Sequence, residues 1–198
     1  MGNEYKENIA YYPIVGYNAP DFSIEAYFND QIRKINSYDY RGSWLVVFFY
    51  PGDFTFVCPT ELGDLAEKYS EIKKIGAEIL ATSTDSVYVH KAWHDFSPLV
   101  QKIKYPLLSD HNGDVSRKYG VYLEEDGVAM RGTFIIDPDG ILKAMEVTDA
   151  SVGRSSEELI RKLEACKFTY ENGDQVCPAN WKPKGETLKP GLDLVSKI

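Results

Sequence analysis

The sequence predicts an α/β sandwich, in which helices flank a central mixed sheet. Residues 44–50 form an apolar run rich in β-branched and aromatic residues, which is typical of a strand buried on both faces. From Thr60 onward the apolar residues follow the helical period, about every 3.6 residues. A turn sequence, Asp-Pro-Asp-Gly at 137–140, joins two further apolar stretches as a hairpin. Strands alternating with helices, then a hairpin and a last helix, indicate this class.

The first predicted unit is a strand, a short loop and a helix. Pro51 and Gly52 end the strand, and Gly76 ends the helix, because glycine readily adopts the left-handed backbone that closes a helix. The side chains expected on the apolar face of this helix are Leu62, Leu65, Ala66, Tyr69, Ile72 and Ile75.

Further elements follow at short intervals. They are a strand over 77–85, a helix over 87–96, an extended piece at 105–108, a small helix ending at Gly120, and the hairpin over 131–147. Ser155 and Glu158 form a capping box that opens a last helix. After residue 172 the periodicity is lost, so we expect one domain over 1–172. A tail over 173–198 would then pack on a surface or on a neighbouring subunit.

The composition indicates a globular protein with neither a nucleic-acid nor a membrane partner. Hydrophobic residues make up 43% of the 198, enough to fill a core. The formal net charge of −8 would repel a phosphate backbone. The longest strongly apolar run, 44–50, is far shorter than the roughly 20 residues that span a bilayer. No signal peptide is visible, and Lys6 stands where a myristoylation motif needs Ser or Thr. We therefore expect a cytoplasmic protein.

The three cysteines, Cys58, Cys166 and Cys177, form no C-x-x-C pair, so neither a zinc site nor a dithiol redox motif is expected. Cys58 stands where the first helix begins, and the helix dipole there favours the thiolate, which is the nucleophilic form. Position alone equally allows a small hydrophobe buried under the helix. Cys166 falls on the apolar face of the last helix, together with Leu159, Ile160 and Leu163, where we expect a buried structural thiol.

Pro51 and Thr55 precede Cys58 in a P-x-x-x-T-x-x-C array. A hydroxyl three residues before the sulfur could bind a substrate oxygen, and a proline could shield the sulfur from water. Taken alone, the two residues would serve as a strand terminator and a turn residue. Arg131 opens a strand, where a cation near the sulfur would stabilise a thiolate; taken alone, it would be a surface charge.

His90 and His94 stand four residues apart on the predicted helix over 87–96, a spacing that can bind metal. No third ligand is evident, so we expect exposed or packing histidines and no metal site.

Several segments resemble the typical two-cysteine peroxiredoxins, and among them the bacterial alkyl hydroperoxide reductase group. They are YPGDFTFVCPTE (50–61), KAWH (91–94), RGTFIIDPDG (131–140), MEVT (145–148), VCPANW (176–181) and GLDLVSKI (191–198). The resemblance runs from about Ala19 onward and implies a thioredoxin-like three-layer sandwich with a C-terminal extension. The first eighteen residues match no known pattern, and either an added strand or a disordered lead would suit them.

The resemblance implies a thiol peroxidase that reduces hydrogen peroxide and alkyl hydroperoxides without a cofactor. Cys58 would become a sulfenic acid, and Cys177 of the partner subunit would close it into a disulfide. The implied supporting residues are Pro51 as a shield, Thr55 and Arg131 as ligands of thiolate and peroxide, Glu61 as the group that orients Arg131, and Trp93 at the rim. A flavoprotein subunit or a thioredoxin-type reductase would restore the thiols. Homodimers would assemble into decamers.

Two other functions stay open at this point. A holdase chaperone or a structural ring would not need Cys58, whereas a thioredoxin-like disulfide reductase is disfavoured by the missing C-x-x-C. The chain also departs from the eukaryotic members, whose G-G-L-G loop and C-terminal Y-F pair resist refolding of the Cys58 helix. Here the stretch before Tyr105 reads SPLVQKIK and the chain ends LDLVSKI. We therefore expect resistance to overoxidation.

Overall fold

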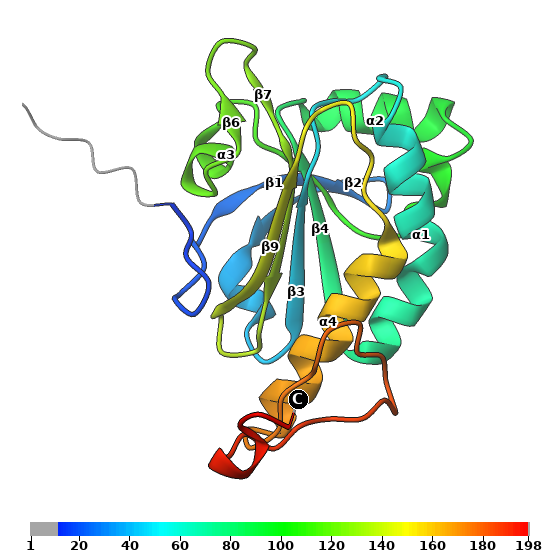
Figure 1. The fold of residues 1–198 in the computed structure, drawn as a ribbon. Coiled ribbons are helices and arrows are strands. Elements are labelled where there is room, and N and C mark those ends of the chain that lie inside the picture. The colour runs from blue at the N-terminus through cyan, green and yellow to red at the C-terminus, as the bar shows by residue number, and fades with distance from the viewer. Residues whose placement is uncertain (1–11, 198) are drawn as a thin grey trace, which may run out of the picture.

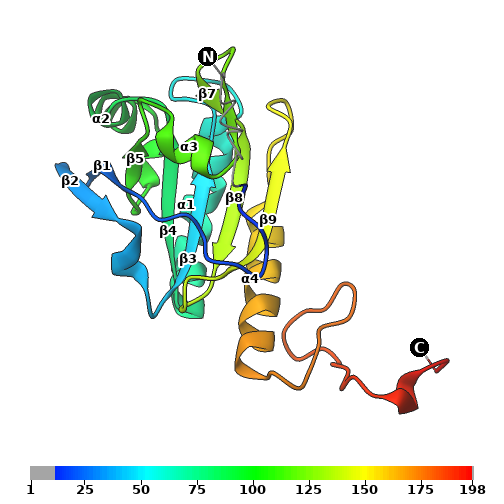
Figure 2. The same ribbon diagram turned by 90° about the vertical axis from the view of Figure 1, so that its left-hand side faces the viewer.

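A computed structural model describes residues 12–197, so the predictions made for residues 1–11 lie outside the described part of the chain. A seven-stranded mixed sheet forms the centre, in the order β2-β1-β5-β4-β3-β8-β9 (Figures 1 and 2). Its strands are β1 (Ser23–Phe28), β2 (Gln31–Asn36), β3 (Trp44–Phe49), β4 (Ala77–Ser83), β5 (Leu107–Ser109), β8 (Arg131–Ile136) and β9 (Leu142–Thr148). A separate small sheet pairs β6 (Tyr122–Leu123) with β7 (Val128–Ala129).

The helices are α1 (Cys58–Ile75), α2 (Val87–Phe96), α3 (Asp114–Lys118) and α4 (Ser156–Glu171), with short 3₁₀ turns at η1 (Ser37–Tyr40), η2 (Val100–Lys102) and η3 (Leu192–Leu194). Helices α1, α2 and α4 cover one face of the sheet, and α3 covers the other (Figure 1). Within residues 12–197, no helix has both the length and the apolar character needed to cross a membrane.

β3 separates two hydrophobic clusters, as its continuous apolar run predicts. Trp44, Val46 and Phe48 belong to the cluster under α1 and α4, whereas Leu45, Val47 and Phe49 belong to the cluster on the α3 side. β3 pairs in parallel with β4 and antiparallel with β8. The prediction of a three-layer sandwich with a mixed central sheet is therefore confirmed.

The helix ends follow local sequence signals. α1 starts at Cys58 and is closed by Gly76, whose φ of +92° lies in the left-handed region that glycine adopts without strain. α2 spans the predicted residues. The Ser155 side chain caps α4 by accepting a hydrogen bond from the backbone N–H of Glu158 at 3.4 Å.

The β1–β2 hairpin has no counterpart in the sequence-based prediction. The side chains of β2 are largely exposed, so no alternation of apolar and polar residues marks this edge strand. Its turn is formed by Asn29 and Asp30, with φ of 50° and 57°, a backbone that these two residue types tolerate. The extended piece predicted at 105–108 is found slightly later, as β5.

The chain continues beyond α4 as an irregular tail that extends from the body (Figure 2). An isolated bridge between Val176 and Leu188 closes a loop in it. Trp181 is buried against Phe168 of α4, with 5.1 Å between the ring centroids. The first part of the tail is thereby fixed to α4, whereas Leu192 near its end is exposed.

Candidate active site

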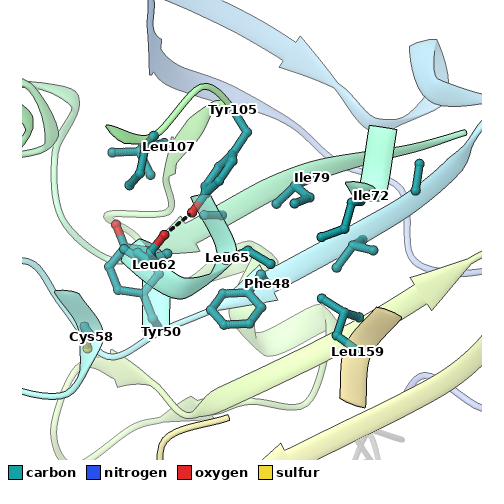
Figure 3. Close-up of a cluster of buried hydrophobic side chains, with 14 of the residues drawn as sticks. Phe48, Tyr50, Cys58, Leu62, Leu65, Ile72, Ile79, Tyr105, Leu107 and Leu159 are labelled. Carbon is teal, nitrogen blue, oxygen red and sulfur yellow. Dashed lines mark hydrogen bonds between the residues drawn. The ribbon is translucent and has the colours of Figure 1, made fainter. Parts of the chain in front are cut away.

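The loop between β3 and α1 places Cys58 at the first position of the helix. Its side chain is 0% exposed and lies at the edge of the buried cluster drawn in Figure 3. The preceding Val57 is the N-cap and offers the helix no side-chain acceptor. The partial positive charge of the helix start is therefore left to act on the sulfur, where it favours a negative charge.

Arg131 brings a full positive charge to the same sulfur. It is the first residue of β8, which lies beside β3, and its Nη1 is 3.3 Å from the Sγ of Cys58. Its Nε and Nη2 donate to the carbonyl oxygen of Ala150 at 2.8 and 2.7 Å. Because these bonds hold the guanidinium in place, the cation beside Cys58 is fixed rather than mobile.

Glu61 joins Arg131 to a second arginine, Arg154. One oxygen of Glu61 accepts from Nη1 of Arg131 at 2.6 Å, and the other accepts from Nε of Arg154 at 2.9 Å. Arg154 also lies over the ring of Phe48, with 3.4 Å between its Cζ and the ring centroid. Burial lowers the pKa of Arg154 from its usual value, while the charges of Glu61 and Cys58 oppose that shift. Two guanidinium groups thus face one carboxylate, and a thiolate at Cys58 would neutralise the remaining positive charge.

Arg154 is the site residue that the sequence-based prediction does not contain. It lies in the loop between β9 and α4, where a single arginine among polar residues gives no periodic signal. Its partner Glu61 is 93 residues away in the chain, so only the fold brings them together.

Pro51 and Thr55 lie in the loop that leads to Cys58. The Thr55 hydroxyl donates to the carbonyl oxygen of Gly52 at 2.9 Å, so in this structure it braces the loop. Between them, Phe54 has a φ of +55°, a strained backbone for a bulky residue and one that often accompanies functional loops.

Aromatic side chains from α2 support this loop. Trp93 is buried, and its ring centroid lies 6.1 Å from those of both Tyr50 and Phe54. Phe54 in turn lies 6.4 Å from Phe96, measured between centroids. The buried Trp93 side chain therefore packs against the loop before Cys58 from the interior of the protein.

His90 is a buried packing histidine. Its Nδ1 lies 2.8 Å from a carboxylate oxygen of Asp53, and its Nε2 lies 3.1 Å from the carbonyl oxygen of Leu108. Asp53 also accepts a hydrogen bond from the Tyr50 hydroxyl at 2.8 Å. Burial raises the pKa of Asp53, and His90 opposes that rise. In the part of the chain that the structure describes, no group of His, Cys, Asp and Glu side chains could hold a metal ion.

The other two cysteines lie far from Cys58. Both are free and partly buried, Cys166 on α4 and Cys177 in the tail, where its Sγ lies 3.9 Å from the carbonyl oxygen of Ala165. α1 and α4 start at the same end of the sheet (Figure 1). Ala165 therefore lies about 14 Å of helix rise from the end at which Cys58 is placed.

Comparisons with known proteins identify a family and several relatives of this chain. The AhpC/TSA family matches residues 15–145. The chain is 45% identical to an alkyl hydroperoxide reductase C of Amphibacillus xylanus over 93% of this chain and 99% of that protein. It is 46% identical to the same-named protein of Escherichia coli K12, over 89% of this chain and 95% of that one.

Two solved structures share the fold. The crystal structure of Enterococcus faecalis AhpC superposes with a TM-score of 0.81 at 45% identity, over 84% of this chain and 99% of that one. The reduced 2-Cys peroxiredoxin of Plasmodium vivax superposes with a TM-score of 0.86 at 35% identity, over 90% of this chain and 94% of that one.

Proposed function

Because the chain belongs to the AhpC/TSA family, we propose that Cys58 is the sulfur with which it reduces peroxides. The chain is a peroxiredoxin, a thiol peroxidase that reduces hydrogen peroxide and alkyl hydroperoxides, so the predictions of family, fold and enzyme class are confirmed. The observation that carries the assignment to Cys58 is the 3.3 Å contact between its sulfur and the fixed guanidinium of Arg131.

The chemistry follows from that contact. The Cys58 thiolate attacks one peroxide oxygen, the O–O bond breaks, and the other oxygen leaves with a proton as water or alcohol. Cys58 is oxidised to a sulfenic acid and the peroxide is reduced. Arg131 is placed to stabilise the charge that spreads over the two oxygens. Thr55 would turn its hydroxyl from Gly52 to the bound peroxide, with Pro51 shielding the sulfur and Glu61 holding Arg131.

Cys177 of the partner subunit is proposed to resolve the sulfenic acid, with loss of water and formation of a disulfide. The separation of the two cysteines within one chain supports a partner, because Cys177 lies beside Ala165 in the middle of α4, away from the start of α1. On this view, residues 1–172 form the catalytic domain and the tail over 173–198 serves the neighbouring active site. A reductase, either a flavoprotein or a thioredoxin-type protein, then restores both thiols. A cytoplasmic location stays a prediction.

Two exposed surfaces of the molecule could each contact another subunit, which supports the proposal of a dimer and a higher oligomer. β9 lies at the edge of the sheet and exposes Met145 and Val147, and such an edge readily pairs with a second copy. A second surface, the aromatic patch, consists of the exposed side chains of Phe54, Phe56 and Phe96. Large exposed apolar side chains of this kind mark protein interfaces, so we assign the edge to the homodimer and the patch to its assembly into decamers.

Two cysteine variants test the catalytic assignment. We expect Cys58→Ser to lower peroxide consumption at least about a thousandfold, since the nucleophile is lost. Cys177→Ala keeps Cys58 and should complete one stoichiometric turnover without a disulfide. Peroxide loss is followed with and without a dithiol reductant. Full activity of Cys58→Ser would overturn the proposal.

A further inference from the structure

Cys166 and Cys177 of one chain lie together, away from Cys58. The Cys177 sulfur lies 3.9 Å from the carbonyl oxygen of Ala165, the residue that precedes Cys166. The two sulfurs are close enough for the charge of Cys177 to raise the pKa of Cys166. Arg161, one helical turn earlier on α4, is close to both, because each sulfur raises its pKa. The chain thus contains a pair of free thiols on a common face.

Contacts on both sides of Cys177 restrain the tail, and those that follow it tie the tail to α4. Before it, the isolated bridge joins Val176 to Leu188. After it, Trp181 packs on Phe168, and Nη1 of Arg161 donates to the Trp181 carbonyl oxygen at 3.4 Å. When a partner's Cys58 approaches, the tail can therefore stay in place and keep Cys177 beside Cys166.

We propose that Cys166 takes part in the reaction cycle by accepting the disulfide from Cys177, an inference that rests on the proposed function of Cys58 and Cys177. Cys166 loses its proton to solvent and attacks the Cys177 sulfur of the intersubunit disulfide. The Cys166–Cys177 bond forms while the Cys58–Cys177 bond breaks. Cys166 is oxidised and Cys58 is reduced, so the exchange needs no further oxidant or reductant.

The thiol–disulfide exchange favours the Cys166–Cys177 bond because Cys58 is a good leaving group. A thiol leaves faster when its thiolate is stabilised, and the departing Cys58 sulfur returns to the guanidinium of Arg131. The exchange also releases the covalent link between subunits. The reductase would then meet an intrachain disulfide on the tail side of α4, away from the buried start of α1.

Time-resolved trapping tests the proposal. Reduced wild type and Cys166→Ser receive one equivalent of hydrogen peroxide per subunit, without reductant, and samples are quenched in acid and alkylated with N-ethylmaleimide. On non-reducing gels we expect the wild-type covalent dimer to rise and then decay to monomer. The Cys166→Ser dimer should persist at least about tenfold longer, and Cys166→Ala should repeat this result. A wild-type dimer as persistent as that of the variants would overturn the proposal.

Peptide mapping identifies the bonds. Trypsin cuts after Lys167 and separates the two thiols, so an intrachain disulfide joins peptides 163–167 and 168–184. We expect this pair to replace the link between Cys58 and Cys177 in the wild type. If Cys58→Ser forms the same pair equally fast, peroxide oxidises it directly and the transfer is overturned. If Cys166→Ser never links Cys58 to Cys177, the proposed function itself fails.

The pH dependence provides a second readout. Burial raises the pKa of the Cys166 thiol, Asp137 adds to the rise, and Lys143 and Arg161 oppose it. Cys177 also raises this pKa in the reduced chain, but it carries no charge once it is in the disulfide. Because only the thiolate attacks, decay of the wild-type dimer should accelerate about tenfold per pH unit below that pKa. A decay rate that does not change with pH would contradict attack by Cys166.

Discussion

Arg131 and Arg154 bring two positive charges to a buried site where Glu61 balances one of them. A neutral thiol at Cys58 would leave the second charge unbalanced, whereas a thiolate neutralises it. Exclusion of water strengthens these interactions. The Arg131 cation that favours the thiolate is also placed to meet the oxygen that gains charge as the O–O bond breaks. In the proposed mechanism, the Arg131 guanidinium therefore stabilises both the Cys58 thiolate and the transition state.

Replacement of Arg131 tests this account at the residue scale. We expect Arg131→Met to lower kcat/KM for hydrogen peroxide by about 10²–10³, the usual effect of removing one donor to a developing negative charge. The value of kcat/KM is measured by letting each variant compete for hydrogen peroxide with a peroxidase of known rate. Arg117→Met is the matched control, since Arg117 pairs with Glu124 on the surface. Equal rates in the two variants would contradict the role of Arg131.

The sequence predicts this site in part. Cys58 stands out because a helix start coincides with a recognisable motif, and Arg131 and Glu61 follow from the resemblance. Arg154 gives no local signal, because its role arises from contacts across the fold with Glu61 and Phe48. The same holds for the thiol pair, since a sequence pattern places Cys166 on an apolar face but cannot place Cys177 over it.

The proposed cycle requires the first turn of α1 to open. Cys58 is 0% exposed, so its sulfenic acid cannot meet a second thiol while the turn is intact. The turn lacks a side-chain cap at Val57 and follows the strained Phe54. Loss of a cap costs a helix start about 1 kcal/mol. This end of α1 is therefore suited to local opening.

Easy opening predicts resistance to overoxidation. The stretch before Tyr105 reads SPLVQKIK in place of the G-G-L-G loop that slows opening in eukaryotic members, so we expect Cys177 to capture the sulfenic acid before a second peroxide does. During turnover at modest peroxide, we expect mass spectrometry to find little sulfinic acid at Cys58. Cys177→Ala, in which nothing captures the sulfenic acid, should accumulate it. Rapid accumulation in the wild type would contradict this expectation.

The sequence predicts helices and strands correctly where the apolar residues follow a single pattern. β3 and α1 follow from a continuous apolar run and a helical stripe, and α4 follows from its cap. The β1–β2 hairpin is missed because β2 is a largely exposed edge strand in which apolar and polar residues do not alternate. Its place in the sheet is set by pairing with β1, which is a non-local contact.

At the scale of the whole molecule, two exposed surfaces lie at separate places on the sandwich. The β9 edge lies at one border of the sheet. The aromatic patch lies where α2 meets the loop before Cys58, since Phe96 ends α2 and its ring packs at a tilt against Phe54. A dimer formed through one surface would leave the other free, which allows pairs to join further into a ring.

A charge placed on the aromatic patch should separate the two levels of assembly. We expect Phe96→Asp to shift the proposed decamers to dimers, because a buried carboxylate without a partner disfavours the interface. Ile32→Asp, a change at an exposed residue of β2 on the opposite border of the sheet from β9, is the control and should leave the assembly intact. Sedimentation velocity resolves the species. Intact decamers of Phe96→Asp would exclude the patch as the ring interface.

Complementation between inactive chains tests the central claim, that Cys58 of one subunit reacts with peroxide and Cys177 of another closes the disulfide. Cys58→Ser and Cys177→Ala chains, both also carrying Cys166→Ser so that the intersubunit bond persists, are co-expressed, isolated as mixed dimers and given one equivalent of peroxide. We predict that peptide mapping will find Cys58 of the second variant joined to Cys177 of the first. Mixed dimers that consume peroxide without this bond, or that leave Cys58 unmodified, would contradict the account.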